Sequence, residues 1–292
     1  MKTSAIITNM ERLSTKMFLS VTAGGLLFII ALQSMAGNEF ASLARMKNSK
    51  AKDSFDLPRQ IDLANAVANG DTKKIQTLIQ QGADVNYVGR DGMRPVLWAI
   101  IKQSLTGLKS LLDNGADANV TVKADNLPRE SALTMAAWLK DAGYLEELLK
   151  HGANPNAPVA WNQDISRWKN MHDAGLPNPV PLEVRDTAIF MVVVGGYQES
   201  ISLLMKYGAD VNWRDASGNT PIHKAIFRNS YQMALLLYHS GADPKIKNKM
   251  DLSSLDTLKK YKDLATYTTD DRKAYKKMVA EFIKDGLLVS EP

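Results

Sequence analysis

The sequence repeats a short glycine-centred motif five times. The motif reads QGADVN, NGADAN, HGANPN, YGADVN and SGADPK, and its glycines are Gly82, Gly115, Gly152, Gly208 and Gly241. The successive glycines are 33, 37, 56 and 33 residues apart, so one spacing recurs while two intervals carry insertions of 4 and 23 residues. A fixed period of this size is typical of chains built from stacked copies of one small unit, each of which buries its apolar face only against its neighbours.

The interval between two motifs has the pattern of two short helices. Ile222, Ala225 and Ile226 fall on one helical face, and the stretch MALLL, residues 233–237, supplies the apolar side of a second helix. Thr220 is a natural N-cap, and Pro221 stands at the first helical position, where its missing N–H is harmless. A motif glycine follows each expected second helix, where a left-handed residue closes the helix.

The stretch TPIHKA, residues 220–225, resembles the opening of the first helix in the ankyrin repeat family, whose unit is 33 residues long. Weaker versions stand at the same offset in RPVLWA (94–99), SALTMA (131–136) and TAIFMV (187–192). The resemblance implies an all-α ankyrin-repeat solenoid of helix-turn-helix units with projecting hairpin turns. We expect five units, at residues 57–88, 89–121, 122–158, 182–214 and 215–247.

The same resemblance assigns structural roles. In this family the histidine of the helix opening, here His223, hydrogen-bonds within and between repeat turns. We therefore interpret His223, Thr220, Pro221 and the five motif glycines as scaffold rather than as a catalytic site.

The first 36 residues have the pattern of an export signal. Arg12 and Lys16 precede an apolar run, and Ser34 and Ala36 place small residues at the positions that a signal peptidase reads. Cleavage after Ala36 is the preferred interpretation, with Met10 as a candidate true start. The alternative is an uncleaved anchor over residues 17–36, a length that can span a bilayer. The predicted location is the periplasm in the first case and the inner membrane, facing the periplasm, in the second.

Three further segments lie outside the regular units. Residues 37–56 are polar and are expected to form a loose arm. The insertion at 159–181 carries Trp161 and Trp168 and is interpreted either as a lid over the repeats or as a finger that enters a partner's cleft. Residues 248–292 have helical periodicity and are expected to form a C-terminal helical cap that covers the last apolar face.

Residue types and their spacing argue against catalysis. The chain has no cysteine and four histidines, none of which stands four residues from another. Aspartates recur at the repeat period, which indicates turns rather than a carboxylate pair. The net charge of +5 is too small to predict nucleic-acid binding. We expect no enzyme activity, no cofactor and no metal.

The candidate binding surface consists of two positions in each first helix. From unit two to unit four both positions are apolar, and unit five adds Phe227 at the second position. The expected partner-binding residues there are Trp98, Ile101, Met135, Trp138, Met191, Val194 and Phe227. Tyr87 and Trp213 extend this edge through the projecting turns, and Trp161 and Trp168 add to it from the insertion. An exposed apolar row of this kind marks an interaction site. The alternative is that some of these side chains pack inward or against the insertion.

The resemblance implies a protein-binding module that works on another protein without catalysis. The sequence is similar to exported immunity proteins that neutralise toxic effectors of type VI secretion, including phospholipase effectors. The alternative is a periplasmic ankyrin scaffold that supports catalase or oxidative-stress protection. The expected partner is a secreted toxin or a periplasmic enzyme, with no nucleic acid and with membrane contact only through the N-terminal segment.

Overall fold

The computed structural model describes residues 47–121, 131–158, 186–261 and 269–290. Residues 49–292 form one compact unit, and the architecture below belongs to it. The expected export signal at 1–36 and the insertion at 159–181, with Trp161 and Trp168, lie outside the described residues. No helix within the described ranges is long and apolar enough to cross a membrane.

The described residues form helices arranged in consecutive pairs. The pairs are α4 (Pro58–Asn69) with α5 (Thr72–Gln80), α6 (Pro95–Ile101) with α7 (Leu105–Asp113), α8 (Ala132–Ala137) with α9 (Gly143–Lys150), α11 (Ala188–Gly195) with α12 (Gln198–Lys206), α13 (Pro221–Phe227) with α14 (Tyr231–His239), and α15 (Ser254–Tyr261) with α16 (Thr269–Lys284). Two short elements, α3 (Ala51–Ser54) and η1 (Arg90–Gly92), precede α4 and α6. Apart from two isolated bridges, Thr121–Ser131 and Lys247–Ser253, these residues contain no β-structure. The prediction of an all-α repeat solenoid is confirmed.

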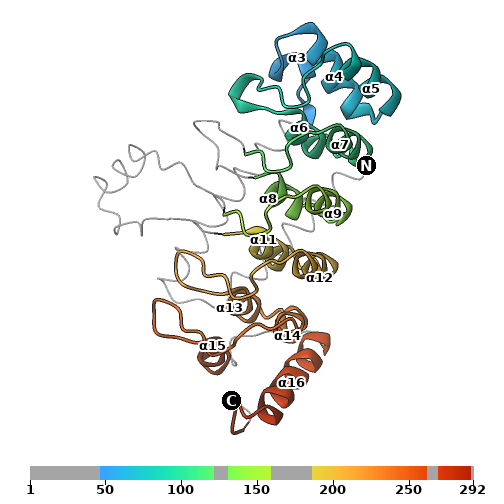
Figure 1. Ribbon diagram of the computed structural model, residues 1–292. Helices are drawn as coiled ribbons and strands as arrows, with labels where there is room; N and C mark the ends of the chain where they lie inside the picture. Colours follow the sequence, from blue (N-terminus) through green and yellow to red (C-terminus); the bar gives the residue numbers. More distant parts are fainter. Residues whose placement is uncertain (1–46, 122–130, 159–185, 262–268, 291–292) are drawn as a thin grey trace, which may run out of the picture. The chain divides into compact units, whose positions relative to one another are not determined.

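The helices form two layers (Figure 1). The first helices, α4, α6, α8, α11, α13 and α15, each contact the next along the chain, and so do the second helices, α5, α7, α9, α12, α14 and α16. The core lies between the layers, where leucines and alanines such as Leu97, Leu108 and Ala136 are fully buried. Because the paired helices have only 6 to 16 residues, their stability comes from this stacking rather than from each helix alone.

Side chains of the repeated motif connect consecutive units. In each of the first four motifs the last asparagine donates its Nδ2 hydrogen to the carbonyl oxygen of the next motif's glycine over 2.9–3.3 Å, and its Oδ1 accepts a backbone N–H two residues beyond that glycine at 2.8 Å. These residues are Asn86, Asn119, Asn156 and Asn212. The Asn156 step joins the units on either side of the 56-residue interval, so the insertion leaves the stacking register intact.

The local predictions for helix ends are confirmed. Thr220 caps α13 with Pro221 at its first turn, and the five motif glycines all have positive φ, between 83° and 95°. His223 links two units, because its Nδ1 accepts the Thr220 backbone N–H at 3.2 Å and its Nε2 donates to the carbonyl oxygen of Leu252 at 3.1 Å.

The C-terminal cap begins with a sixth, altered repeat unit. α15 packs on α13, as each first helix packs on the one before it, and α16 packs on α14. Ser253 and Asp256 hydrogen-bond each other across the first turn of α15, in the place of Thr220 and His223. Asp251 has φ 59° at the position where Gly218 has φ 76°, so the turn is retained without its glycine. The described residues of the segment expected to form the cap belong mainly to α15 and α16.

The prediction of a loose arm over residues 37–56 is wrong for the described part. Residues 51–54 form α3, which packs against α4 and η1. Ala51 is 3% exposed and Phe55 is 0% exposed, so two apolar side chains anchor a segment whose other residues are mostly polar.

Candidate functional site

The structure divides the predicted binding row into a buried and an accessible part. Four of its members have at most 7% of their surface exposed: Trp98, Ile101, Met135 and Met191. The expectation that these four line an open surface is wrong. Trp98, Met135 and Met191 lie within first helices that contact one another directly, so these positions face a neighbouring helix instead of solvent. Ile101 is the last residue of α6 and is 6% exposed.

Trp98 illustrates this burial. Its indole Nε1 donates a hydrogen bond to the carbonyl oxygen of Ala64 in α4 at 2.9 Å. The Trp98 ring packs edge-to-face with Phe55, with the ring centroids 5.7 Å apart. The Lys102 ammonium lies 4.3 Å from the centroid of the Trp98 ring. Trp98 is therefore part of the core between the first two units.

The accessible part of the row consists of the last-turn residues Trp138, Val194 and Phe227, which we call the first-helix face. Phe227 is 56% exposed, and Trp138 and Val194 are half-buried. They stand at equivalent positions at the ends of α8, α11 and α13, helices that contact one another in turn. Of the predicted turn residues, Tyr87 and Trp213 are also half-buried. An exposed phenylalanine beside half-buried tryptophan and valine is the composition of a protein-binding surface.

The corresponding part of units one and two is covered by the chain itself. Lys102, next to Ile101, donates from Nζ to the carbonyl oxygen of Ser49 at 2.5 Å. Burial of the Lys102 ammonium lowers its pKa. Phe55 packs between Trp98 and Tyr87, at centroid distances of 5.7 and 6.4 Å. Residues 49–57 thus close the surface that in units three to five remains accessible.

The projecting turn of unit two is fitted to the same segment. The Tyr87 hydroxyl donates a short hydrogen bond to the Asp56 carboxylate, which lowers the pKa of Asp56 and raises the pKa of Tyr87. A Cβ atom on Gly89 would lie 2.2 Å from the Ser54 carbonyl oxygen, so only glycine permits this approach. Sequence reasoning missed the segment; its signal was Phe55, a large apolar residue three positions before the helix-opening Pro58.

A charged cluster lies where unit four meets unit five. Lys224 Nζ lies 2.8 Å from Asp215 Oδ2, and the other oxygen of Asp215 accepts the backbone N–H groups of Ser217 and Asn219 at 2.8 Å. Asp186 lies nearby, and burial raises its pKa to about 6, while Lys224 lowers this value and Asp215 raises it. The cluster orders the fifth projecting turn through hydrogen bonds and charge pairing.

His223 has a structural role among the described residues. Burial lowers the pKa of His223, and its two nitrogens are engaged in the joint between units. No group of three or more His, Asp or Glu side chains in the described part could hold a metal ion.

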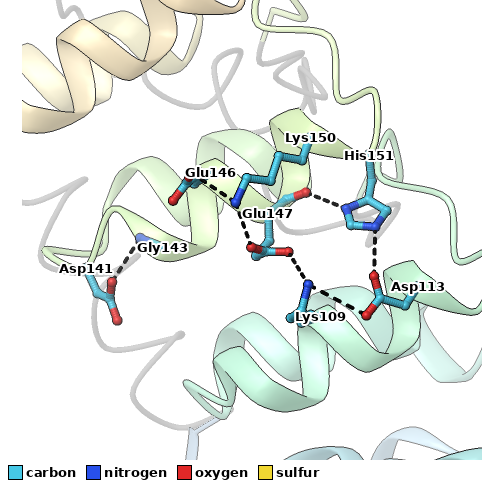
Figure 2. A network of polar contacts seen from close by, with 8 residues as sticks. All are labelled: Lys109, Asp113, Asp141, Gly143, Glu146, Glu147, Lys150 and His151. Atoms are coloured by element: carbon cyan, nitrogen blue, oxygen red, sulfur yellow. Dashed lines mark hydrogen bonds and ion pairs between the residues drawn. The ribbon is translucent and has the colours of Figure 1, made fainter.

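The exposed sides of α7 and α9 are polar, and their charged groups pair with one another. Figure 2 shows Lys109 of α7 between Asp113 and Glu147, at 3.7 and 3.3 Å, and Lys150 of α9 between Glu146 and Glu147, at 3.0 and 3.2 Å. His151 completes the network through Asp113 at 3.2 Å. On α7 and α9 the lysines are thus paired with carboxylates of the same or the adjacent helix.

Fold and site define an α-helical repeat solenoid that binds other proteins. The family model described as ankyrin repeats (3 copies) matches residues 63–159 and 163–248. This match covers more than half of the chain, and the chain belongs to the ankyrin repeat family.

Similarity to individual proteins extends over part of the sequence. Protein PhlB of Serratia liquefaciens is 33% identical over 171 residues, which are 59% of this chain and 63% of PhlB. An ankyrin repeat protein of Acanthamoeba polyphaga mimivirus is 27% identical over 165 residues, 51% of this chain and 40% of that protein. The chain therefore spans less than two thirds of the length of these curated relatives.

A similar solved structure comes from the complex of a predatory endopeptidase of Bdellovibrio bacteriovorus with an immunity protein. One chain of it matches with a TM-score of 0.53 and 24% sequence identity, covering 74% of this chain and 97% of that chain. At this identity the likeness concerns the fold.

Proposed function

We propose that this protein is an immunity protein that binds a toxic effector in the periplasm and blocks its activity, with a phospholipase effector of type VI secretion as the favoured target. The observation that carries the proposal is the first-helix face. Phe227, Trp138 and Val194 are accessible in units three to five, whereas the rest of the predicted row is buried.

The physical properties of this surface suit tight binding. The surface lies on short helices held on both sides by neighbouring units, so little conformational entropy is lost when a partner docks. Aromatic side chains of this kind provide most of the binding energy in protein interfaces. Ankyrin repeats are protein-interaction modules, and the solved complex of similar fold contains an immunity protein beside an endopeptidase. The export pattern of residues 1–36 supports a periplasmic site of action.

The test is protection against an effector encoded beside this gene in its native genome. The effector is directed to the periplasm of a heterologous bacterial host, alone or together with the full chain, and survival is measured. We expect the chain to restore growth and to form a stable complex with the effector in size-exclusion chromatography. For a phospholipase effector, purified chain should also inhibit hydrolysis of phospholipid vesicles at equimolar ratio.

Matched variants connect protection to the surface. Phe227→Ala combined with Trp138→Ala should abolish protection, whereas Gln76→Ala combined with Gln80→Ala, two exposed changes on α5, should leave it intact. If no neighbouring secreted effector is neutralised and the chain instead co-purifies with a catalase or another stress enzyme, the immunity function is wrong.

A further inference from the structure

The solvent-facing side of α16 carries an excess of positive charge. Between residues 272 and 284 the exposed cations are Arg272, Lys273, Lys276, Lys277 and Lys284. This stretch contains one carboxylate, Glu281, and it is flanked by Asp270, Asp271 and Asp285. At 100° per residue the five cations fall within about 140° of the helix circumference. Ala274, Tyr275, Met278, Val279 and Phe282 occupy the opposite, buried side.

This charge distribution differs from that of α7 and α9. On α7 and α9 the lysines are enclosed by Asp113, Glu146 and Glu147 (Figure 2). On α16, Glu281 lies 2.6 Å from His239 Nε2 and 4.0 Å from Lys277 Nζ, so one carboxylate serves two basic groups. Five like charges on four helical turns repel one another and weaken the helix. The cap function requires only the buried side, which leaves the excess charge available for a counter-charge outside the chain.

A groove beside α16 adds an apolar component. It has a volume of about 450 Å³ and lies between α14 and α16. Leu235, Leu236 and Ala274 provide apolar lining, while Lys273, Lys277 and His239 provide basic groups, with Gln198 and Gln232 completing the lining. This combination suits a ligand that has an anionic head and an apolar body.

Exposed apolar residues lie close to the same surface in sequence. Ile283 is 38% exposed and falls within the cationic sector, and Val289, just after the helix, is 100% exposed. Lysine-rich helical surfaces with interspersed apolar residues bind the plane of anionic bilayers, where the charges meet headgroups and the apolar side chains enter the interface. An acidic protein patch would satisfy the cations, but it gives no role to a groove with both apolar and basic lining.

We propose that the exposed side of α16, together with the α14–α16 groove, binds the surface of bilayers that contain anionic phospholipid. The inference goes beyond the proposed function and does not rest on it. Each Lys or Arg close to an anionic leaflet strengthens partitioning about fivefold, so this helix can supply useful affinity while the first-helix face holds a protein partner.

The experiment is co-sedimentation with two sets of extruded vesicles. One set is phosphatidylcholine alone, and the other contains about 30 mol% phosphatidylglycerol, which gives a strongly negative surface. The protein used in this experiment is the chain from Gly37 onward, which keeps every residue that the structure describes and leaves out the apolar N-terminal run. We expect binding to the anionic vesicles at least about tenfold stronger than to the neutral ones, and its loss at about 0.5 M salt, where the Debye length is only a few ångströms.

The variant Lys273→Glu with Lys277→Glu should weaken binding to anionic vesicles at least about tenfold. Its matched control is Lys73→Glu with Lys74→Glu, two exposed lysines of α5 that change the net charge equally; this control should change binding less than about twofold. Circular dichroism and thermal melting establish folding, and Arg272→Gln with Lys276→Gln replaces the first variant if it unfolds.

Three results would overturn the proposal: no preference for anionic vesicles by the folded chain, equal losses in the α16 variant and its α5 control, or undiminished binding in both α16 variants. An α16 variant that binds vesicles normally but loses a protein partner would assign the surface to an acidic protein instead. Protection against an effector is measured separately, so either function can fail without the other.

Discussion

Trp98 in unit two donates a hydrogen bond from its indole nitrogen to the carbonyl oxygen of Ala64 in unit one, at 2.9 Å. This bond joins the first helices of two consecutive units inside the core, where Trp98 is 1% exposed. With Phe55 packed against the same ring, Trp98 connects the N-terminal segment, unit one and unit two.

Trp98→Ala should lower the free energy of unfolding by about 3–5 kcal/mol, because it removes a fully buried aromatic side chain. Trp98→Phe retains most of the ring and removes the N–H donor, so it should cost about 1–2 kcal/mol. Urea unfolding followed by circular dichroism measures both. If Trp98→Ala costs less than 1 kcal/mol, roughly the effect of a surface change, Trp98 is not a core residue.

His223 should make stability depend on pH. Burial lowers its pKa below the usual 6.5, so the folded state binds this proton less readily than the unfolded state. Stability is therefore fully present above pH 6.5 and decreases as the pH falls from there toward the folded-state pKa. His223→Ala should cost about 1–3 kcal/mol at pH 7, since it leaves the Thr220 and Leu252 groups without their partner. The difference in free energy of unfolding between wild type and variant, measured by urea unfolding, should be smaller at pH 5 than at pH 7. The same difference at both pH values would contradict this explanation.

Asp186 should have the opposite effect. Burial raises its pKa from 3.8 to about 6, so above pH 6 the folded state holds a charge that the unfolded chain keeps in water. Its destabilisation is present at pH 7–8 and disappears as the pH falls from 6 toward 3.8. Asp186→Asn should therefore raise the free energy of unfolding by about 2 kcal/mol at pH 8 and have little effect at pH 4. Thermal melting at the two pH values tests this, and a variant that is less stable at pH 8 would refute it.

The sequence was sufficient to predict the repeat architecture because the repeat is specified by local interactions. Thr220 and Pro221 start a helix, a glycine in the left-handed region ends the next helix, and Asn212 hydrogen-bonds the following motif. Each residue acts within its own turn or on the adjacent copy. Spacing alone is therefore enough to place them.

The accessible positions of the first helices were predicted only in part, because helical periodicity assigns a residue to one side of a helix without identifying what covers that side. Met135 and Met191 follow the same period as Phe227, yet adjacent first helices bury the methionines. Phe55 packs on Trp98 from a segment that looks polar. The sixth unit was hidden for a related reason: it has Asp251 at the turn position where unit five has Gly218, and both residues take the left-handed conformation.

Asn156 should determine whether the array unfolds as one unit. Asn156 hydrogen-bonds across units three and four, whose motifs are separated by the long insertion. Its Nδ2 donates to the Gly208 carbonyl oxygen at 3.0 Å, and its Oδ1 accepts the Asp210 backbone N–H at 2.8 Å. Asn156→Ala should cost about 1–3 kcal/mol and weaken the interface at this point. In hydrogen exchange, α13 and α14 should then open separately from α4 to α7. Asn119→Ala removes the same pair of bonds between units two and three and is the control; identical exchange patterns in both variants would contradict a special role for Asn156.

Substitutions at Phe227 and Met191, which lie in the same layer of helices, should affect binding and stability differently. Phe227 is 56% exposed, so Phe227→Ala should change the free energy of unfolding by less than about 1 kcal/mol while weakening binding of a neutralised effector by about 2 kcal/mol or more. Met191 is 7% exposed, and Met191→Ala should cost about 2–5 kcal/mol of stability, with affinity nearly unchanged at temperatures where the variant is folded. Urea unfolding and isothermal titration calorimetry of both variants give the four values. If Phe227→Ala leaves the affinity unchanged, the partner does not use the first-helix face, because this residue is its most exposed member.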